Sequence, residues 1–199
     1  MHINDFIQGL IIGGTLIIAL GPQNLFVIQQ GLKKTYVFTV SLFCSLSDSL
    51  LIIIGIYLSD YIVGINPAII NIIKVLGGIW LIFYGLNKIR KLNQIKDLNK
   101  ELNIANEYGK VLTTLFLITY ANPHVYLDTI ILLGSLSTNF NDQFSFGIGA
   151  IAASFLFFFS LGYMSKFLSN YIYSNKTWFW IDLTIGLLMI SYGIYFIIF

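Results

Sequence analysis

The chain has 199 residues, of which 57% are hydrophobic and only 10% are charged, and its mean hydropathy is +0.81. Soluble domains carry about a quarter charged residues, so this composition excludes an ordinary soluble protein and indicates an integral membrane protein. The single cysteine, Cys44, excludes an intramolecular disulfide.

Six apolar stretches follow one another along the chain, each near or above the ~20 residues that a bilayer-spanning helix requires. They cover about residues 5–30, 36–59, 67–87, 111–136, 144–166 and 178–198. The connections are short, and none is long enough to form a soluble domain. We therefore predict an all-α, polytopic membrane protein with six transmembrane helices in a single domain over residues 1–199.

Basic residues gather in three of the connections: after the first predicted span, between the third and fourth, and between the fifth and sixth. They are Lys33, Lys34, Lys88, Arg90, Lys91, Lys96, Lys100, Lys110, Lys166 and Lys176. Because an excess of lysine and arginine marks cytoplasmic loops, we predict that both termini lie outside the cell. This orientation accounts for the basic loops, so they predict no nucleic-acid partner.

The two halves of the chain share weak matches that occur in the same order. Pro22 matches Pro123, residues 57–59 match 163–165, and GGIWLIFYG at 77–85 matches IGLLMISYG at 185–193 with four identities. Three matches in order indicate an internal repeat. We assign repeat A to residues 1–92, a cytoplasmic loop to 93–109 and repeat B to 110–199.

Each repeat holds three predicted spans, an odd number, so the second must be inserted upside down relative to the first. Inverted repeats are typical of secondary transporters. These proteins place the substrate near the middle of the membrane, where discontinuous helices meet, and expose it to the two sides in turn.

Pro22 and Pro123 occupy corresponding positions in the first and fourth spans. Each removes a backbone N–H and clashes with the carbonyl four residues earlier, so both helices are predicted to break there. Freed backbone groups cannot face lipid, so the breaks must be buried or line a polar cavity. With Gln23, Asn24 and Asn122 beside them, the breaks and their half-helix N-termini are suited to the carboxylate and amine of an amino acid. The alternative is that both prolines only kink their helices.

Charged residues within predicted spans are functional candidates by default. At ~1.5 Å per residue, Asp48 and Lys74 lie at similar depths in the membrane, which allows an ion pair of functional or merely structural importance. His124 and Asp128 stand one helical turn apart, a spacing compatible with two metal ligands. A histidine that is hydrogen-bonded at the broken helix explains the pattern better, and we expect no metal site.

Five segments resemble the LysE family of basic amino-acid exporters, and its lysine and arginine exporter branch more than its homoserine and threonine branch. In order over nearly the whole chain, they are GPQNLFVIQQGLKK at 21–34, LFCSLSDSLLIIIGI at 42–56, GGIWLIFYGL at 77–86, NPHVYLDTIILLGSLS at 122–137 and GAIAASFLFFF at 149–159. The resemblance implies export of L-lysine or L-arginine across the bacterial inner membrane, energised by the proton motive force. It implies no organic cofactor.

The resemblance also carries site residues onto this chain. The substrate-binding positions that match are Gly21, Pro22, Gln23, Asn24, Asn122, Pro123, His124, Tyr126 and Asp128. Asp48 matches as well, and we assign it to proton coupling, with Lys74 as the charge beside it. Protonated from outside, Asp48 releases a cationic substrate; deprotonated toward the cytoplasm, it binds one.

Other readings use the same features. The chain could export other small amino acids, or form a passive channel for small cations, although paired breaks favour alternating access. A membrane-embedded enzyme needs a fuller acid, base or metal constellation than His124 and Asp128 offer, so we predict no enzyme. The sequence leaves open the choice between lysine and arginine, the number of protons per cycle and the number of chains that assemble, a homodimer being one arrangement.

Overall fold

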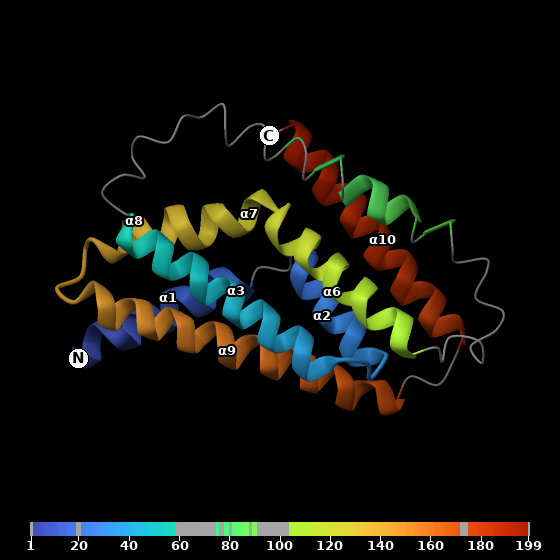
Figure 1. The fold of residues 1–199 in the computed structure, drawn as a ribbon, viewed down its shortest axis with the longest axis horizontal. Helices are drawn as coiled ribbons and strands as arrows, with labels where there is room; N and C mark the ends of the chain where they lie inside the picture. Colours follow the sequence, from blue (N-terminus) through green and yellow to red (C-terminus); the bar gives the residue numbers. More distant parts are fainter. Residues whose placement is uncertain are drawn as a thin grey trace.

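The computed structural model describes residues 2–18, 21–58, 75, 78–79, 81–87, 89–90, 104–171 and 175–198. Figure 1 shows these residues as a helical assembly, and they contain no strand. The elements are α1 (Ile3–Ile18), α2 (Pro22–Leu32), α3 (Val37–Tyr57), α6 (Ile104–Tyr120), α7 (Pro123–Tyr126), the π-helix η3 (Leu127–Leu132), α8 (Leu133–Ser137), α9 (Gln143–Leu168), the 3-10 helix η4 (Ser169–Tyr171) and α10 (Asn175–Ile198). The all-α prediction is confirmed for this part of the chain.

Two described helices, α3 and α9, are each long and apolar enough to cross a membrane. A third crossing is formed if α1 and α2, which meet at a bend of 79°, are counted as one broken span. The third predicted span lies largely outside the described residues, so the total of six stays a prediction. Helix α6 begins at Ile104, inside the stretch 93–109 that we assigned to a cytoplasmic loop, and the division into repeats stays a prediction.

Helix α1 lies along α9 with the two backbones in direct contact. Its isoleucines at positions 3, 7 and 11 are exposed, whereas Gly9 and Gly13 are buried against α9. A Cβ on Gly13 would lie 2.8 Å from the Cα of Ala150, and one on Gly9 would meet the carbonyl oxygen of Phe146. Small residues allow this close approach, which supplies dispersion contacts where lipid offers no hydrophobic drive for helices to associate.

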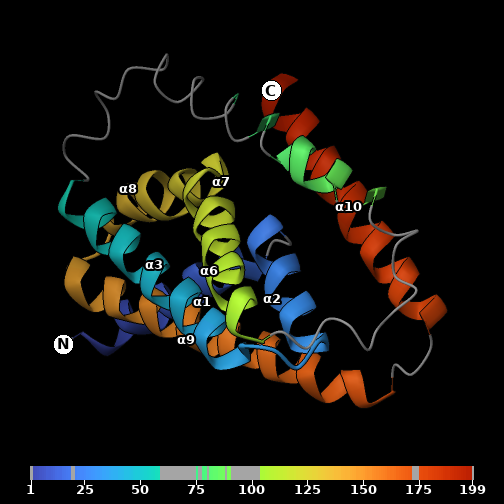
Figure 2. The same ribbon diagram turned by 45° about the vertical axis from the view of Figure 1, so that its right-hand side comes forward.

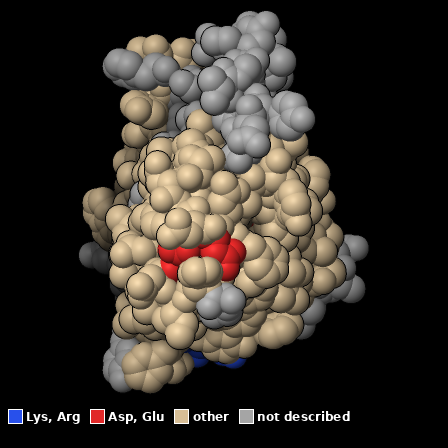
Figure 3. Space-filling view, turned by 90° about the vertical axis from the view of Figure 1, so that its left-hand side faces the viewer, with Lys and Arg blue, Asp and Glu red and all other residues tan. Residues whose placement is uncertain are grey.

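Polar bonds fasten the N-terminus to the beginning of α9. The Asp142 carboxylate accepts hydrogen bonds from the Ser145 hydroxyl at 2.5 Å and from the Ser145 backbone N–H at 3.1 Å, which caps α9. These bonds lower the pKa of Asp142 to about 2. Asp5 accepts from the backbone N–H of Asp142 at 2.9 Å. Figure 3, which faces this end of the molecule, shows acidic atoms gathered amid uncharged ones.

The lysines of the turn after α2, of the first part of α6 and of the last turn of α9 lie at the opposite end of the molecule. They are Lys33, Lys34, Lys110 and Lys166. Figure 1 shows the end of α2, the beginnings of α3 and α6 and the end of α9 together at its lower right. The charged residues that are described at the two ends of the bundle therefore have opposite signs.

Helix α10 packs against residues 81–87, and both views of the ribbon show them side by side (Figure 2). Glycines make the contact in two places. A Cβ on Gly78 would lie 2.6 Å from the carbonyl oxygen of Gly193, and one on Gly85 would lie 2.6 Å from that of Gly186. In the repeat alignment Gly78 corresponds to Gly186 and Gly85 to Gly193, so each contact is the repeat-swapped image of the other.

The α1–α9 contact can be tested with two adjacent glycines. In Gly13→Ala the new methyl group meets the backbone of Ala150, so we expect a clearly lower Tm in detergent, in line with the ~1–3 kcal/mol that overpacking costs. In Gly14→Ala the new Cβ would lie 3.8 Å from the Cβ of Ala153, an ordinary contact, so the Tm should hold or rise. Equal effects in both variants would contradict the packing described here.

Candidate functional site

The first predicted break is present where proline requires it. Helix α1 ends at Ile18, the residue whose carbonyl Pro22 would meet in a continuous helix, and α2 begins at Pro22 itself. Gly21 caps α2 in an extended conformation (φ −102°, ψ 176°). The Asn24 amide donates a hydrogen bond of 3.0 Å to the carbonyl oxygen of Ile17, one of the groups that the break leaves without a helical partner.

The second break mirrors the first. Helix α6 ends at Tyr120 and α7 begins at Pro123. The Tyr126 hydroxyl donates a 2.6 Å hydrogen bond to the carbonyl oxygen of Tyr120, and the Tyr120 hydroxyl donates one of 3.1 Å to Ser47 on α3. Both breaks therefore have freed carbonyl groups satisfied by nearby side chains, as burial away from water requires.

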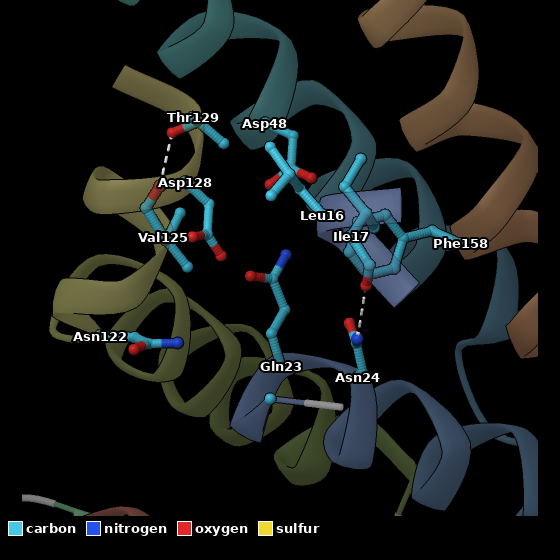
Figure 4. A pocket seen from close by; sticks show the side chains of 11 residues that line it. Leu16, Ile17, Gln23, Asn24, Asp48, Asn122, Val125, Asp128, Thr129 and Phe158 are labelled. Atoms are coloured by element: carbon cyan, nitrogen blue, oxygen red, sulfur yellow. Dashed lines mark hydrogen bonds between the residues drawn. The ribbon is translucent and has the colours of Figure 1, made fainter. Parts of the chain in front are cut away.

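A cavity of about 50 Å³ lies between the two breaks and α3. It is lined by Leu16, Ile17, Gly21, Gln23, Asn24, Asp48, Asn122, Val125, Asp128, Thr129 and Phe158, most of which Figure 4 labels. This volume holds a few water molecules and is well below the ~300 Å³ at which pockets for small ligands begin. In this conformation the space between the two breaks is too small for an amino acid.

Asp48 enters the cavity from the middle of α3 and is only 4% exposed. Its carboxylate accepts a 3.0 Å hydrogen bond from the Ser154 hydroxyl on α9. Asp128 contributes a second carboxylate from η3. Among the described residues that line the cavity, these two are acidic and none is basic. The site is therefore suited to a positively charged guest.

Gln23 carries a buried amide close to Asp48 and Cys44. Figure 4 shows it extending from α2 toward the carboxylates of Asp48 and Asp128. The side chain is 4% exposed, and its nitrogen makes no hydrogen bond with any described residue. An unpaired buried donor costs about 1–3 kcal/mol, so its retention at a cavity indicates a donor kept for water or for a ligand.

The structure brings six of the predicted site residues to this cavity: Gly21, Gln23, Asn24, Asp48, Asn122 and Asp128. Pro22 is buried but does not line it. Tyr126 does not line it either, and its hydroxyl braces the second break instead. The side chains of Pro123 and His124 lie outside the described part of the chain, as does Lys74. The Asp48–Lys74 ion pair therefore stays a prediction.

Ser154 is the polar partner that sequence reasoning missed. It stands inside the apolar segment GAIAASFLFFF and is completely buried against Asp48. A lone hydroxyl in an apolar span was the only available signal, and it does not say which helix the serine faces. Thr129 of η3, also at the cavity, donates to the carbonyl oxygen of Val125 in the preceding α7.

Comparison with known proteins gives one family and a group of close relatives. A model of the LysE type translocators matches residues 15–199. The arginine exporter protein ArgO of Escherichia coli (strain K12) is 33% identical over 188 residues, which are 92% of this chain and 89% of that protein. Its counterpart in Salmonella schwarzengrund (strain CVM19633) is 32% identical over 190 residues, 94% and 90% of the two chains. No solved structure matches the chain.

The site predicts opposite stability effects for two conservative variants. Gln23→Met removes the unpaired amide at nearly constant volume, so the Tm should hold or rise. Tyr126→Phe removes the 2.6 Å bond at the second break and leaves a carbonyl group short of a partner, so the Tm should fall by the equivalent of about 1 kcal/mol. Thermal unfolding in detergent measures both. A marked fall in the Gln23→Met variant would show that the amide has a structural partner.

Proposed function

The chain belongs to the LysE family of translocators, and we propose that it exports basic L-amino acids (arginine, lysine or both) from the bacterial cytoplasm in exchange for protons. It is a transporter rather than an enzyme. The proposal places it in the inner membrane as six transmembrane helices in two inverted repeats, with both termini outside the cell. Its mechanism is alternating access to one central site.

The observation that carries the substrate class is the charge of the cavity. Asp48 and Asp128 bring two carboxylates to a buried site whose described lining holds no basic residue. A zwitterionic amino acid with a neutral side chain has one cationic group, whereas arginine and lysine have two. Two carboxylates therefore match a basic amino acid better than they match other small amino acids.

The carboxylate of the substrate needs hydrogen-bond donors, which the two aspartate carboxylates do not supply. Gln23 supplies an unpaired amide nitrogen at the cavity, and it stands in the first turn of α2. The N-terminus of a helix attracts anions, because its first N–H groups have no intrahelical partner and the helix dipole adds to their field. We assign the first turn of α2 to the substrate carboxylate and the two aspartates to its cationic groups.

The transported charge explains why a proton must move the other way. Carrying one positive charge outward against a negative-inside potential costs about 2.3 kcal/mol per 100 mV. Exchange for one incoming proton makes the cycle electrically neutral. Asp48 suits this exchange, because its buried carboxylate accepts a hydrogen bond from the neutral hydroxyl of Ser154 and no basic residue is among the described residues that line the cavity. A proton and a cationic substrate then compete for the same carboxylate.

Three features support the inverted repeat and its orientation. Breaks occur at the corresponding prolines, Pro22 and Pro123. The glycine contacts between residues 78–85 and α10 come in repeat-swapped pairs. The described lysines lie at one end of the bundle and the Asp5–Asp142 contact at the other, which under the positive-inside rule makes the lysine end cytoplasmic.

The two repeats differ in a way that alternating access requires. At the end that we assign to the outside, α1 packs along α9 with backbone contact. Its counterpart α6 contacts α3 much less extensively, in part through Tyr120 against Phe43 and Ser47. If one repeat adopts the packing of the other, the seal moves to the opposite end. The outer side is then the one that opens from this conformation, while the cytoplasmic side closes.

Transport by reconstituted protein tests the role of Asp48. We expect wild-type proteoliposomes to accumulate arginine against its gradient when a pH gradient is imposed, and to show counterflow between preloaded and external arginine, which a channel does not show. Asp48→Asn should lower the gradient-driven rate at least about tenfold, the effect of about 1.4 kcal/mol.

The matched control is Asp5→Asn, which changes a mostly buried acid far from the cavity and should transport at the wild-type rate. Asp48→Asn that kept gradient-driven transport with normal proton dependence would refute the coupling role. Transport without counterflow in the wild type would favour a passive channel.

A further inference from the structure

A second cavity, of about 330 Å³, lies at the lysine end of the bundle, beside the turn that joins α2 to α3 and the end of α9. It is lined by Lys34, Tyr163, Lys166, Phe167 and Asn170. It is separate from the transport cavity and shares no lining residue with it. We propose that this cavity binds the phosphate of an anionic phospholipid headgroup.

The two lysines that line the cavity favour the binding of an anion. Lys34 and Lys166 come from different elements and bring two ammonium groups to one space. Lys34 donates a 2.6 Å hydrogen bond to the amide oxygen of Asn170, which is neutral, and the Lys166 ammonium lies 5.8 Å from the centroid of the Tyr163 ring. Within the described residues, neither lysine has a carboxylate partner. A phosphate between them would satisfy both ammonium groups.

Lys34 has a backbone conformation that normally favours glycine. It follows the last turn of α2 with a φ of 58°, in the left-handed region. Its N–H bonds to the carbonyl of Gly31 and the N–H of Thr35 bonds to that of Gln30, the pattern of a Schellman motif. Glycine is the usual residue at this position, because a side chain there is strained. Lysine at such a position indicates that its side chain has a use.

The surroundings identify the anion as part of a lipid. On the last turns of α9, Met164 is 69% exposed, Phe167 62% and Leu168 56%. Side chains of this kind belong in hydrocarbon, and Phe167 also lines the cavity. The cavity therefore opens where acyl chains meet headgroups, with its aromatic rings at the depth of the interfacial belt. A free phosphate ion would gain nothing from the apolar wall, whereas a phospholipid fits both parts. Basic pockets between helices on the cytoplasmic side are typical sites for anionic lipids.

The position links this site to the transport cavity through one helix. Helix α2 begins at Pro22, next to Gln23 at the transport cavity, and ends at Leu32, two residues before Lys34. Near its end, Gly31 packs against α9, where a Cβ would lie 2.7 Å from the carbonyl oxygen of Gly162. A headgroup that bridges Lys34 and Lys166 would hold the end of α2 against α9. It would also neutralise two positive charges on the side from which a cationic substrate enters.

Binding can be tested without measuring transport, so its failure is distinct from failure of the proposed function. The full chain is purified in a neutral detergent and titrated with phosphatidylglycerol, phosphatidylcholine or inorganic phosphate. We expect phosphatidylglycerol alone to raise the Tm by several degrees, and native mass spectrometry to show one phosphatidylglycerol retained per chain. The double variant Lys34→Gln, Lys166→Gln should lose most of the shift and the retained lipid.

Lys33→Gln is the matched control, because Lys33 lies in the same turn, is exposed and does not line the cavity. It should keep the full shift. If the double variant folds poorly, Lys34→Gly replaces it. Glycine removes the backbone strain at this position, so the Tm in phosphatidylcholine should rise, while the Tm increase caused by phosphatidylglycerol should become smaller. The proposal is overturned if the double variant binds phosphatidylglycerol like the wild type, if Lys33→Gln loses as much as the double variant, or if inorganic phosphate reproduces the shift.

Discussion

Two interrupted helices must satisfy their own backbone, because lipid offers no hydrogen bonds, and the rest of the site depends on this constraint. Asn24 and Tyr126 each donate to a carbonyl group freed by a break. These bonds work only if both breaks lie inside the protein, facing α3. The same arrangement brings Asp48 and Asp128 to one cavity. The two helix breaks, their burial inside the protein and the acidic cavity therefore arise together from one arrangement of the helices.

The cavity is energetically unfavourable when empty, which is informative about its use. The Asp48 carboxylate and the Gln23 amide are buried, and Asp128 is partly buried, around a space that holds only a few waters. A protein selected for stability alone would fill this volume with apolar side chains, since burying charge and unpaired donors costs free energy. Such costs persist at functional sites, where a ligand or a proton completes the set of interactions.

Glycine packing and charge give the bundle its two different ends. At the acidic end, close contact of α1 with α9 seals the molecule around the N-terminus. At the lysine end, α6 is packed less extensively against α3, and the turn after α2 presents its ammonium groups beside α9. A transporter needs such a difference between its ends, because the site must be closed on one side while the other opens. The lipid site that we propose would act on the end that moves.

The sequence by itself determined the helical class, the two breaks and the acidic candidates. These depend on local chemistry: proline removes an N–H wherever it stands, and a carboxylate within an apolar span is visible in any fold. Only the tertiary structure decided that Ser154 faces Asp48, that Tyr126 braces a break instead of lining the cavity, and that Lys34 and Lys166 share a space. Each of these depends on how helices are rotated against one another, and that rotation is set by packing between segments far apart in the sequence. Lys34 and Lys166, for example, are 132 residues apart.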